Sequence, residues 1–136
     1  MRAGELSIGD WCLYGQRYCI ITKVSYDKVS ILVNTGFQDE IIVETLDNIE
    51  PIPLTVEILE KNGFEMADDT YTRPTVFYFS KDRRVQFSNL TNSGDGYWCV
   101  HVDNEDFETI GSCDVQYVHL MQNFLRLCKY ELDLKI

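Results

Sequence analysis

Short runs of apolar residues, separated by turn residues, fill roughly the first fifty positions of the chain. These runs are rich in β-branched and aromatic residues, which suit a pleated and half-buried surface, so each run predicts a strand. The last run stops at Pro51, because proline cannot donate a ladder hydrogen bond. The predicted strands are Trp11 to Tyr14, Arg17 to Ser25, Val29 to Val33, Glu40 to Val43 and a short one near Ile49. This pattern predicts a small, strongly bent barrel of the SH3-like kind.

A short helix is predicted directly after this barrel, because both of its ends carry sequence signals. Thr55 is an N-cap residue, and Glu57 lies in the first turn, where the helix dipole favours an acid. Gly63 can take the left-handed conformation that ends a helix, and Phe64 then packs back onto Leu59. A helix of about two turns depends on packing to hold it in place.

Three further strands follow in the pattern. They are Thr75 to Ser80, Arg84 to Leu90 and Tyr97 to Val102, with turns at 81–83 and 92–96. The first of them is apolar on both faces, which indicates a central strand or one covered by a helix. The second alternates between apolar and polar residues, so one of its faces should be wet.

The strongest helix signal runs from Val115 to about Leu132, with Asp114 or Ser112 as the expected N-cap. At roughly 100° per residue, the apolar side chains cover about half of the helical wheel. His119 falls near the centre of the polar half and is expected to be exposed. This apolar arc is wider than a helix needs to pack on one sheet, which indicates deep burial or contact with another chain. The candidate interface residues on this arc are Tyr117, Leu120, Phe124 and Leu127.

The elements together predict an α+β fold. An N-terminal small SH3-like β-barrel is followed by a short helix, an antiparallel sheet of three to four strands and a C-terminal amphipathic helix. The corresponding modules are residues 1–53 and 54–136, packed as one unit.

Charge narrows the choice of partners. The chain has 136 residues and a formal net charge of −10. Nucleic-acid binding depends on Lys and Arg displacing counterions from phosphates, and the closest basic pair, Arg83 and Arg84, is preceded by Asp82. Nucleic acid is therefore an unfavoured partner, and the charge is read as a solubility feature.

The five cysteines, Cys12, Cys19, Cys99, Cys113 and Cys128, form no Cys-x-x-Cys pair. No secretory signal precedes them, and no stretch approaches the roughly twenty apolar residues that span a bilayer. Cysteines among apolar residues usually act as small buried side chains in reducing compartments. We therefore expect reduced thiols, a cytoplasmic location and no membrane association.

Three groups of residues carry a resemblance to a known family. They are Leu6 with Ile8-Gly9-Asp10-Trp11, Ile52-Pro53-Leu54-Thr55 with Glu57, Leu59, Gly63 and Phe64, and Tyr117-Val118-His119 with Gln122-Asn123 and Glu131-Leu132. With them the chain resembles a family of short uncharacterised proteins of gut Bacteroidetes and of their phages and mobile elements. The resemblance covers most of the chain and implies a source and a shape, but no activity.

Candidate metal and nucleophile sites are weak. Cys99 and His101 share one face of a strand and Cys113 could approach them, but zinc is usually held by close ligand pairs. Cys99 with His119 would need an activated thiolate and an orienting third group. We predict no catalytic residue, no metal, no cofactor and no small-molecule ligand.

Two loops carry residues that metal or phosphate sites use. The acids from Asp103 to Glu108 resemble a solvated turn more than a calcium loop, because the glycine comes too late. Gly94-Asp95-Gly96 lacks the lysine and the following helix of a phosphate-binding loop.

Aromatic residues of the barrel give the one positive functional indication. Trp11, Tyr14, Tyr26 and Phe37 lie on or beside its predicted turns, and small barrels often bind extended peptides in an aromatic groove. The leading hypothesis is a non-enzymatic protein-binding or assembly module that binds a protein partner or self-associates. The alternatives are an acidic inhibitor that mimics a nucleic-acid surface and a small enzyme of unknown reaction.

Overall fold

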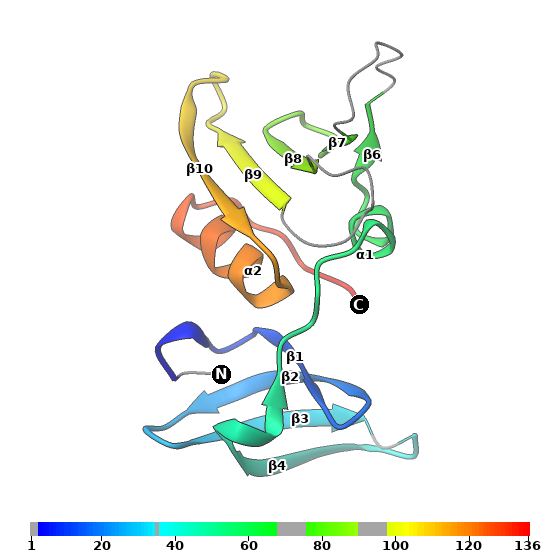
Figure 1. The fold of residues 1–136 in the computed structure, drawn as a ribbon, viewed down its shortest axis with the longest axis vertical. Helices are drawn as coiled ribbons and strands as arrows, with labels where there is room; N and C mark the ends of the chain where they lie inside the picture. Colours follow the sequence, from blue (N-terminus) through cyan, green and yellow to red (C-terminus); the bar gives the residue numbers. More distant parts are fainter. Residues whose placement is uncertain (1–2, 35, 68–75, 90–97) are drawn as a thin grey trace. The chain divides into compact units, whose positions relative to one another are not determined.

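The structure, a computed structural model, describes residues 3–34, 36–67, 76–89 and 98–136. Over these residues the fold is α+β, with two antiparallel five-stranded sheets and two α-helices (Figure 1). The chain divides into two compact units, Met1–Ile52 with Tyr117–Asn123 and Pro53–Gln116 with Phe124–Ile136. None of the helices among these residues is long and apolar enough to cross a membrane.

The sheet of the first unit is a meander whose last strand returns to pair with its first. Its order is β4-β3-β2-β1-β5. One 3-10 turn, η1 (Ala3–Glu5), precedes the sheet, and another, η2 (Leu46–Asn48), connects its last two strands. The strands are β1 (Trp11–Tyr14), β2 (Arg17–Val24), β3 (Lys28–Asn34), β4 (Asp39–Thr45) and β5 (Ile49–Glu50). All five predicted strands are confirmed, with ends that differ by a few residues.

Alternating side chains of this sheet build the core of the first unit. Cys12 pairs with Cys19 across β1 and β2, and Ile31 of β3 lies opposite Ile21. The buried cluster that they form comprises Leu6, Cys12, Cys19, Ile21, Val29, Ile31, Val33 and Ile49. The period of two places the strand residues of this cluster on one face of the sheet, and Leu6 joins them from the segment before β1.

The helix α2 (Val118–Leu127) supplies polar residues that fix the start of the chain within the first unit. The Gln122 side chain accepts a hydrogen bond from the Trp11 amide (2.9 Å) and donates one to the Gly9 carbonyl (3.2 Å). Asn123 Nδ2 donates to the Glu5 carbonyl at 3.0 Å and to Asp10 Oδ2 at 3.3 Å. These side chains satisfy backbone groups that the strands leave unpaired.

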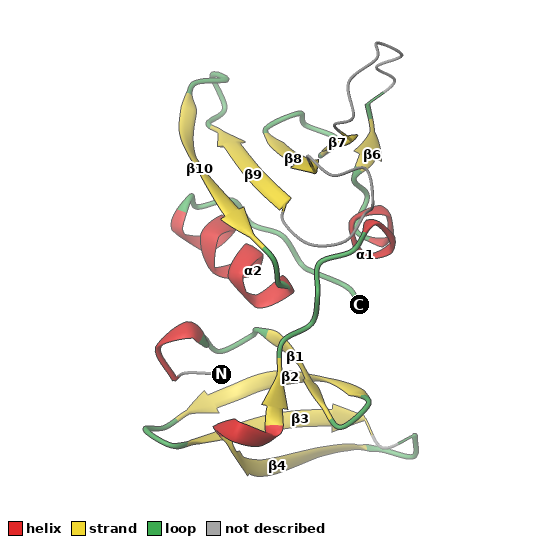
Figure 2. Ribbon diagram, in the orientation of Figure 1, coloured by secondary structure: helices red, strands yellow, loops and turns green. Residues whose placement is uncertain are grey.

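The second unit contains a short helix, the last residues of α2 and a sheet with the order β10-β9-β8-β7-β6 (Figure 2). Its elements are α1 (Val56–Lys61), β6 (Glu65–Met66), β7 (Val76–Phe79), β8 (Val85–Asn89), β9 (Trp98–Asp103) and β10 (Thr109–Val115). The prediction of three to four strands is corrected to five, because two strands were missed. β6 has only two residues, and β10 occupies the region where the terminal helix was expected to begin.

The ends of α1 are confirmed in detail. Thr55 Oγ1 accepts a hydrogen bond from the Ile58 amide at 3.4 Å, as expected for an N-cap. Gly63 has a φ of 84°, and the Phe64 amide donates to the Leu59 carbonyl at 3.0 Å. These are the features of a Schellman motif, in which a left-handed residue ends the helix.

The predicted N-caps and length of α2 are wrong. Ser112 and Asp114 pair with His101 and Cys99 of β9, so they belong to a strand and cannot cap a helix. The helix runs over ten residues, Val118–Leu127, in place of the expected 115–132. It ends early because Lys129 takes a left-handed conformation with a φ of 55°, a position that usually favours glycine.

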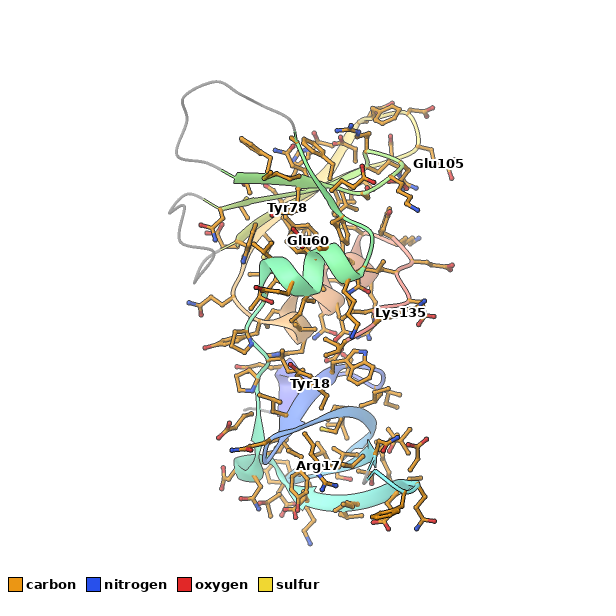
Figure 3. All side chains as sticks on the ribbon, turned by 90° about the vertical axis from the view of Figure 1, so that its right-hand side faces the viewer. Arg17, Tyr18, Glu60, Tyr78, Glu105 and Lys135 are labelled. Carbon is orange, nitrogen blue, oxygen red and sulfur yellow. The ribbon has the colours of Figure 1, made fainter. Side chains whose placement is uncertain are left out.

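Aromatic side chains dominate the core of the second unit. Phe64 and Phe87 meet edge to face with ring centroids 5.1 Å apart. Trp98 is buried, and its Nε1 donates a hydrogen bond to the Leu54 carbonyl at 3.0 Å. Tyr78 points from the sheet towards Glu60 of α1 (Figure 3). The helix therefore covers the face of the sheet that carries these rings.

The remaining predictions for the loops fall partly on residues that the structure does not describe. The turn at 92–96, with Gly94-Asp95-Gly96, and the start of the strand at Thr75 lie outside the described residues. The acidic segment forms the turn between β9 and β10, where Asn104 Oδ1 accepts hydrogen bonds from the Asp106 and Glu108 amides at 2.9 Å each.

Candidate functional site

A surface groove of about 620 Å³ opens on the first unit. Residues from four segments of this unit line the groove: the β1–β2 turn, the neighbouring strands β3 and β4, the 3-10 turn η2, and β5. The lining residues are Tyr14, Gly15, Gln16, Arg17, Val33, Ile42, Asp47, Asn48 and Glu50. Val33 and Ile42 give the groove an apolar part, while Arg17, Asp47 and Glu50 place charges in its lining.

Local backbone geometry brings these elements together. Tyr14 pairs with Arg17, so Gly15 and Gln16 form a two-residue hairpin loop, and Gly15 supplies the positive φ of 62° that such loops need. On the other side, η2 leads directly into β5, which pairs with β1 at Tyr14. The pairing of β5 with β1 therefore places the β1–β2 turn, η2 and Tyr14 in one site.

A hydrogen-bonded triad fixes the aromatic ring of the groove. The Tyr14 hydroxyl donates to Glu44 Oε1 at 2.8 Å, and Asn48 Nδ2 donates to Glu44 Oε2 at 2.8 Å. Both bonds favour the charged carboxylate, so the Asn48 and Tyr14 donors lower the pKa of Glu44. The same hydrogen bond raises the pKa of Tyr14, because ionising the phenol would place two negative charges side by side.

The four predicted aromatic residues do not share one surface. Tyr14 lies at the groove, whereas Trp11 is three positions earlier on the same strand and points to the other face of the sheet. Tyr26 and Phe37 are 95% and 100% exposed, in the turns before and after β3. The structure thus joins Tyr14 with polar residues of other elements, and it separates Tyr14 from the other three aromatics.

The groove contains residues that the sequence reasoning did not select. Arg17 lines it, and the next residue of β2, Tyr18, points to the opposite face (both labelled in Figure 3). Asp47 and Asn48 reach the groove through η2. Tyr14 was the one lining residue of this groove that the sequence analysis selected.

The candidate interface on α2 has mixed exposure. Tyr117, Leu120 and Phe124 are half-buried, and only Leu127 is largely exposed, at 81%. Phe124 packs over β10, where a Cβ placed on Gly111 would lie 3.7 Å from its ring. Most of the apolar arc is therefore covered, and the other arc residues, Val118, Met121, Leu125 and Cys128, are buried.

The expectation of an exposed His119 is wrong. This side chain is 1% exposed, and neither ring nitrogen has a hydrogen-bond partner among the described residues. Burial lowers the pKa of His119, against the opposing effect of Asp10 and Glu5. Gln122, which lies on the same polar side of the helical wheel, is also buried. Tertiary packing on the start of the chain overrides the helical wheel at both positions.

The residues considered for metal or covalent chemistry gather only in part. His101 Nε2 lies 2.8 Å from Asp103 Oδ1, and Cys99 is on the same face of β9. Cys113 pairs with Val100 and belongs to the other face. Burial and the nearby Asp114 raise the pKa of Cys99, which keeps it a thiol. The described residues contain no group of three metal-ligand side chains.

The basic pair is engaged inside the second unit. The Arg84 guanidinium lies 5.3 Å from the Tyr130 ring centroid, and its Nε donates to the Asp103 carbonyl at 3.1 Å. Arg83 lies 5.1 Å from the ring centroid of Phe79. Each guanidinium therefore has an aromatic partner in its own unit.

Comparisons of this chain with protein-family models, with curated proteins and with solved structures found no match.

Proposed function

We propose that this chain is a non-enzymatic protein-binding module that holds an extended segment of a partner protein in the Tyr14 groove. The groove carries the proposal, because it combines a fixed aromatic ring, an apolar part and charges in a volume of about 620 Å³. Binding sites of this kind use an apolar surface for affinity and a few placed polar groups for orientation.

The chemistry of the lining selects the segment. Tyr14 and Ile42 offer contact to apolar or proline residues, which bind well in an extended, pre-ordered form. The charged residues of the lining are two acids, Asp47 and Glu50, and one base, Arg17. The proposed ligand is therefore an extended peptide that places a basic residue opposite the two acids.

The proposal includes an SH3-like barrel for the first unit. It is supported by the five-stranded meander, by the return of β5 to β1 and by the 3-10 turn η2 before the last strand. The buried cluster on one face of this sheet, around Cys12 and Ile31, is consistent with the interior of such a barrel. A cytoplasmic location and a phage or mobile-element origin remain part of the proposal, resting on the free thiols and on the sequence resemblance.

Protein binding is favoured over mimicry of nucleic acid by the spacing of the acids. Glu40 and Glu44 share one face of β4 and lie about 14 Å apart at the normal rise of a strand. A duplex presents one charge per roughly 1.7 Å of its axis. Asp39, the third acid of β4, points to the opposite face from Glu40, so neither face of this strand carries a continuous row of charges.

The groove is tested by selecting peptides from a display library on the full chain and measuring their binding by calorimetry. Tyr14→Ala should weaken a selected peptide by about tenfold or more, because truncating a central aromatic anchor usually has this effect. Tyr14→Phe keeps the ring and removes only the hydrogen bond to Glu44, so it should weaken binding less.

The matched control is Tyr26→Ala, which removes the same side chain from a position that is 95% exposed and outside the groove. It should leave the affinity unchanged. Equal losses in Tyr14→Ala and Tyr26→Ala, or failure to select any peptide that binds, would count against the proposal.

A further inference from the structure

The edge strands of the two sheets differ in how open they are to another strand. β5 and β6 have two residues each, and β10 is interrupted by a register shift between Thr109 and Gly111. Short and bulged edges resist pairing with another chain. β4 has seven residues, pairs with β3 in unbroken register and pairs with no other strand in the described part of the chain. It is the long and regular edge, at the lower border of the first sheet in Figure 1.

An apolar row leads across the first sheet to this edge. Trp11 pairs with Ile20, Ile20 with Leu32, and Leu32 with Ile41, so one apolar residue from each of four strands stands in register. These residues lie on the face opposite the core cluster. At the edge the row is open, since Ile41 is 69% exposed and Val43, the next residue on that face, is 63% exposed. A strand added to β4 could continue this row.

The charge around β4 selects the chemistry of such a strand. No lysine, arginine or histidine occurs between Lys28 and Lys61. Within the first unit this stretch carries five acids, Asp39, Glu40, Glu44, Asp47 and Glu50. Glu40 is exposed and lies on the other face from Ile41. An added strand therefore meets aliphatic side chains on one face and a carboxylate on the other.

We propose that the edge of β4 binds a basic strand of a partner protein by strand addition, through Glu40, Ile41 and Val43, which do not line the Tyr14 groove. The bound segment alternates aliphatic residues, which continue the row at Ile41 and Val43, with Lys or Arg residues, which face Glu40. Main-chain hydrogen bonds give affinity and the alternating side chains give specificity.

A second copy of this chain fits the edge less well. Two copies of β4 paired about Ile42 would place Glu40 of each opposite Glu44 of the other, and like charges directly opposite are destabilising. Each copy also carries a net charge of −10. In this register the acids oppose self-pairing, while they attract a basic strand.

The experiment uses the full chain and a capped peptide that alternates lysine and valine over seven residues, the length of β4. Binding is measured by calorimetry, and amide hydrogen exchange of β4 is followed by NMR. The expected result is saturable binding with slower exchange of β4 amides. Two peptide controls are methylated at every second backbone nitrogen, one in each phase. Successive amides of a strand point to opposite edges, so only one of the two peptides loses the N–H groups that face β4. That peptide should not bind.

Variants of the chain separate strand addition from general attraction. Ile41→Lys and Glu40→Lys should each weaken the peptide by about tenfold or more, because each places a positive charge against a basic strand. The matched control, Ile110→Lys, makes the same change on the edge strand β10 and should not affect binding. Tyr14→Ala should not affect binding of this peptide either. A wrong groove proposal and a wrong edge proposal therefore give different results.

Three binding results would each overturn the proposal: the alternating peptide does not bind, both methylated peptides bind as well as the parent, or Ile110→Lys weakens binding as much as Ile41→Lys. A concentration-dependent dimer of the chain without peptide, abolished by Ile41→Lys, would also overturn it and assign the edge to self-association.

Discussion

The two sheets have the same number of strands, but they differ on the face that points away from the core. In the second sheet that face is largely polar where β8 and β9 meet, with Gln86 beside His101 and Ser88 beside Cys99. In the first sheet the corresponding face carries the row Trp11, Ile20, Leu32 and Ile41. The outer face of the second sheet is therefore polar at β8 and β9, with Phe77 and Phe79 added by β7. In the first sheet an apolar row crosses four strands of the outer face.

The difference shows where the chain keeps apolar surface that folding of its own sheet does not use. The inner face of the first sheet is already filled by the cluster around Cys12 and Ile31. The outer row ends in exposed aliphatic residues at β4, Ile41 and Val43. Apolar surface that remains exposed in this way often marks an interaction site.

Thiol reactivity gives the largest expected contrast between the two sheets. Burial raises the pKa of Cys12 from 9.0 to about 12 and that of Cys19 to about 11. At neutral pH the reactive thiolate of Cys12 is then about a thousandfold scarcer than that of an ordinary thiol. Cys113, exposed on β10, should react with iodoacetamide first. Peptide mass spectrometry over a time course measures the order, and equal rates at Cys12 and Cys113 would show that the inner face of the first sheet is open.

Much of the fold could be predicted because its signals are local. Runs of β-branched and aromatic residues between turns located the strands of the first sheet, and Thr55 and Gly63 located α1 to the residue. β10 was missed because its sequence, from Thr109 to Val115, mixes small and polar residues without clear alternation, and its strand character comes from pairing with β9. The early end of α2 at Lys129 carries no glycine signal.

The candidate site was less predictable, because it depends on contacts between distant residues. Tyr14 was selected, but its partners Glu44 and Asn48 come from β4 and η2 and are recognisable only once β5 pairs with β1. Similarly, His119 and Gln122 lie on the polar side of the helical wheel and are buried by residues more than a hundred positions earlier. No periodicity within one element reports such contacts.

Two isoleucines on neighbouring strands test whether the outer face of the first sheet is free. Ile31 and Ile41 differ in exposure, at 0% and 69%. Ile31→Ala should lower the free energy of unfolding by about 2–5 kcal/mol, because it leaves a cavity in the core. Ile41→Ala should change it by no more than about 0.5 kcal/mol. Urea denaturation measures both, and a loss above about 1.5 kcal/mol for Ile41→Ala would indicate that the outer row is part of a core.

The smallest expected effect concerns the two histidines, one in each unit. His119 in the first unit is buried without a hydrogen-bond partner among the described residues, whereas His101 of the second sheet is half-buried and bonded to Asp103. A buried polar group without a partner is destabilising, so His119→Phe should raise the free energy of unfolding by about 1 kcal/mol at pH 7.5. His101→Phe, the matched control, should not stabilise the protein, because it removes a satisfied group.

The effect of His119 should grow on acidification. Burial lowers the pKa of His119 in the folded state below its ordinary value of 6.5, so the unfolded chain binds a proton more readily just below that pH. The His119 contribution therefore destabilises the native protein as the pH falls through 6.5, and His119→Phe should remove this part of the loss. Urea denaturation of both proteins at pH 7.5 and 5.5 measures the difference. If the gain from His119→Phe is the same or smaller at pH 5.5, the ring is already charged in the folded protein, and Asp10 and Glu5 outweigh its burial.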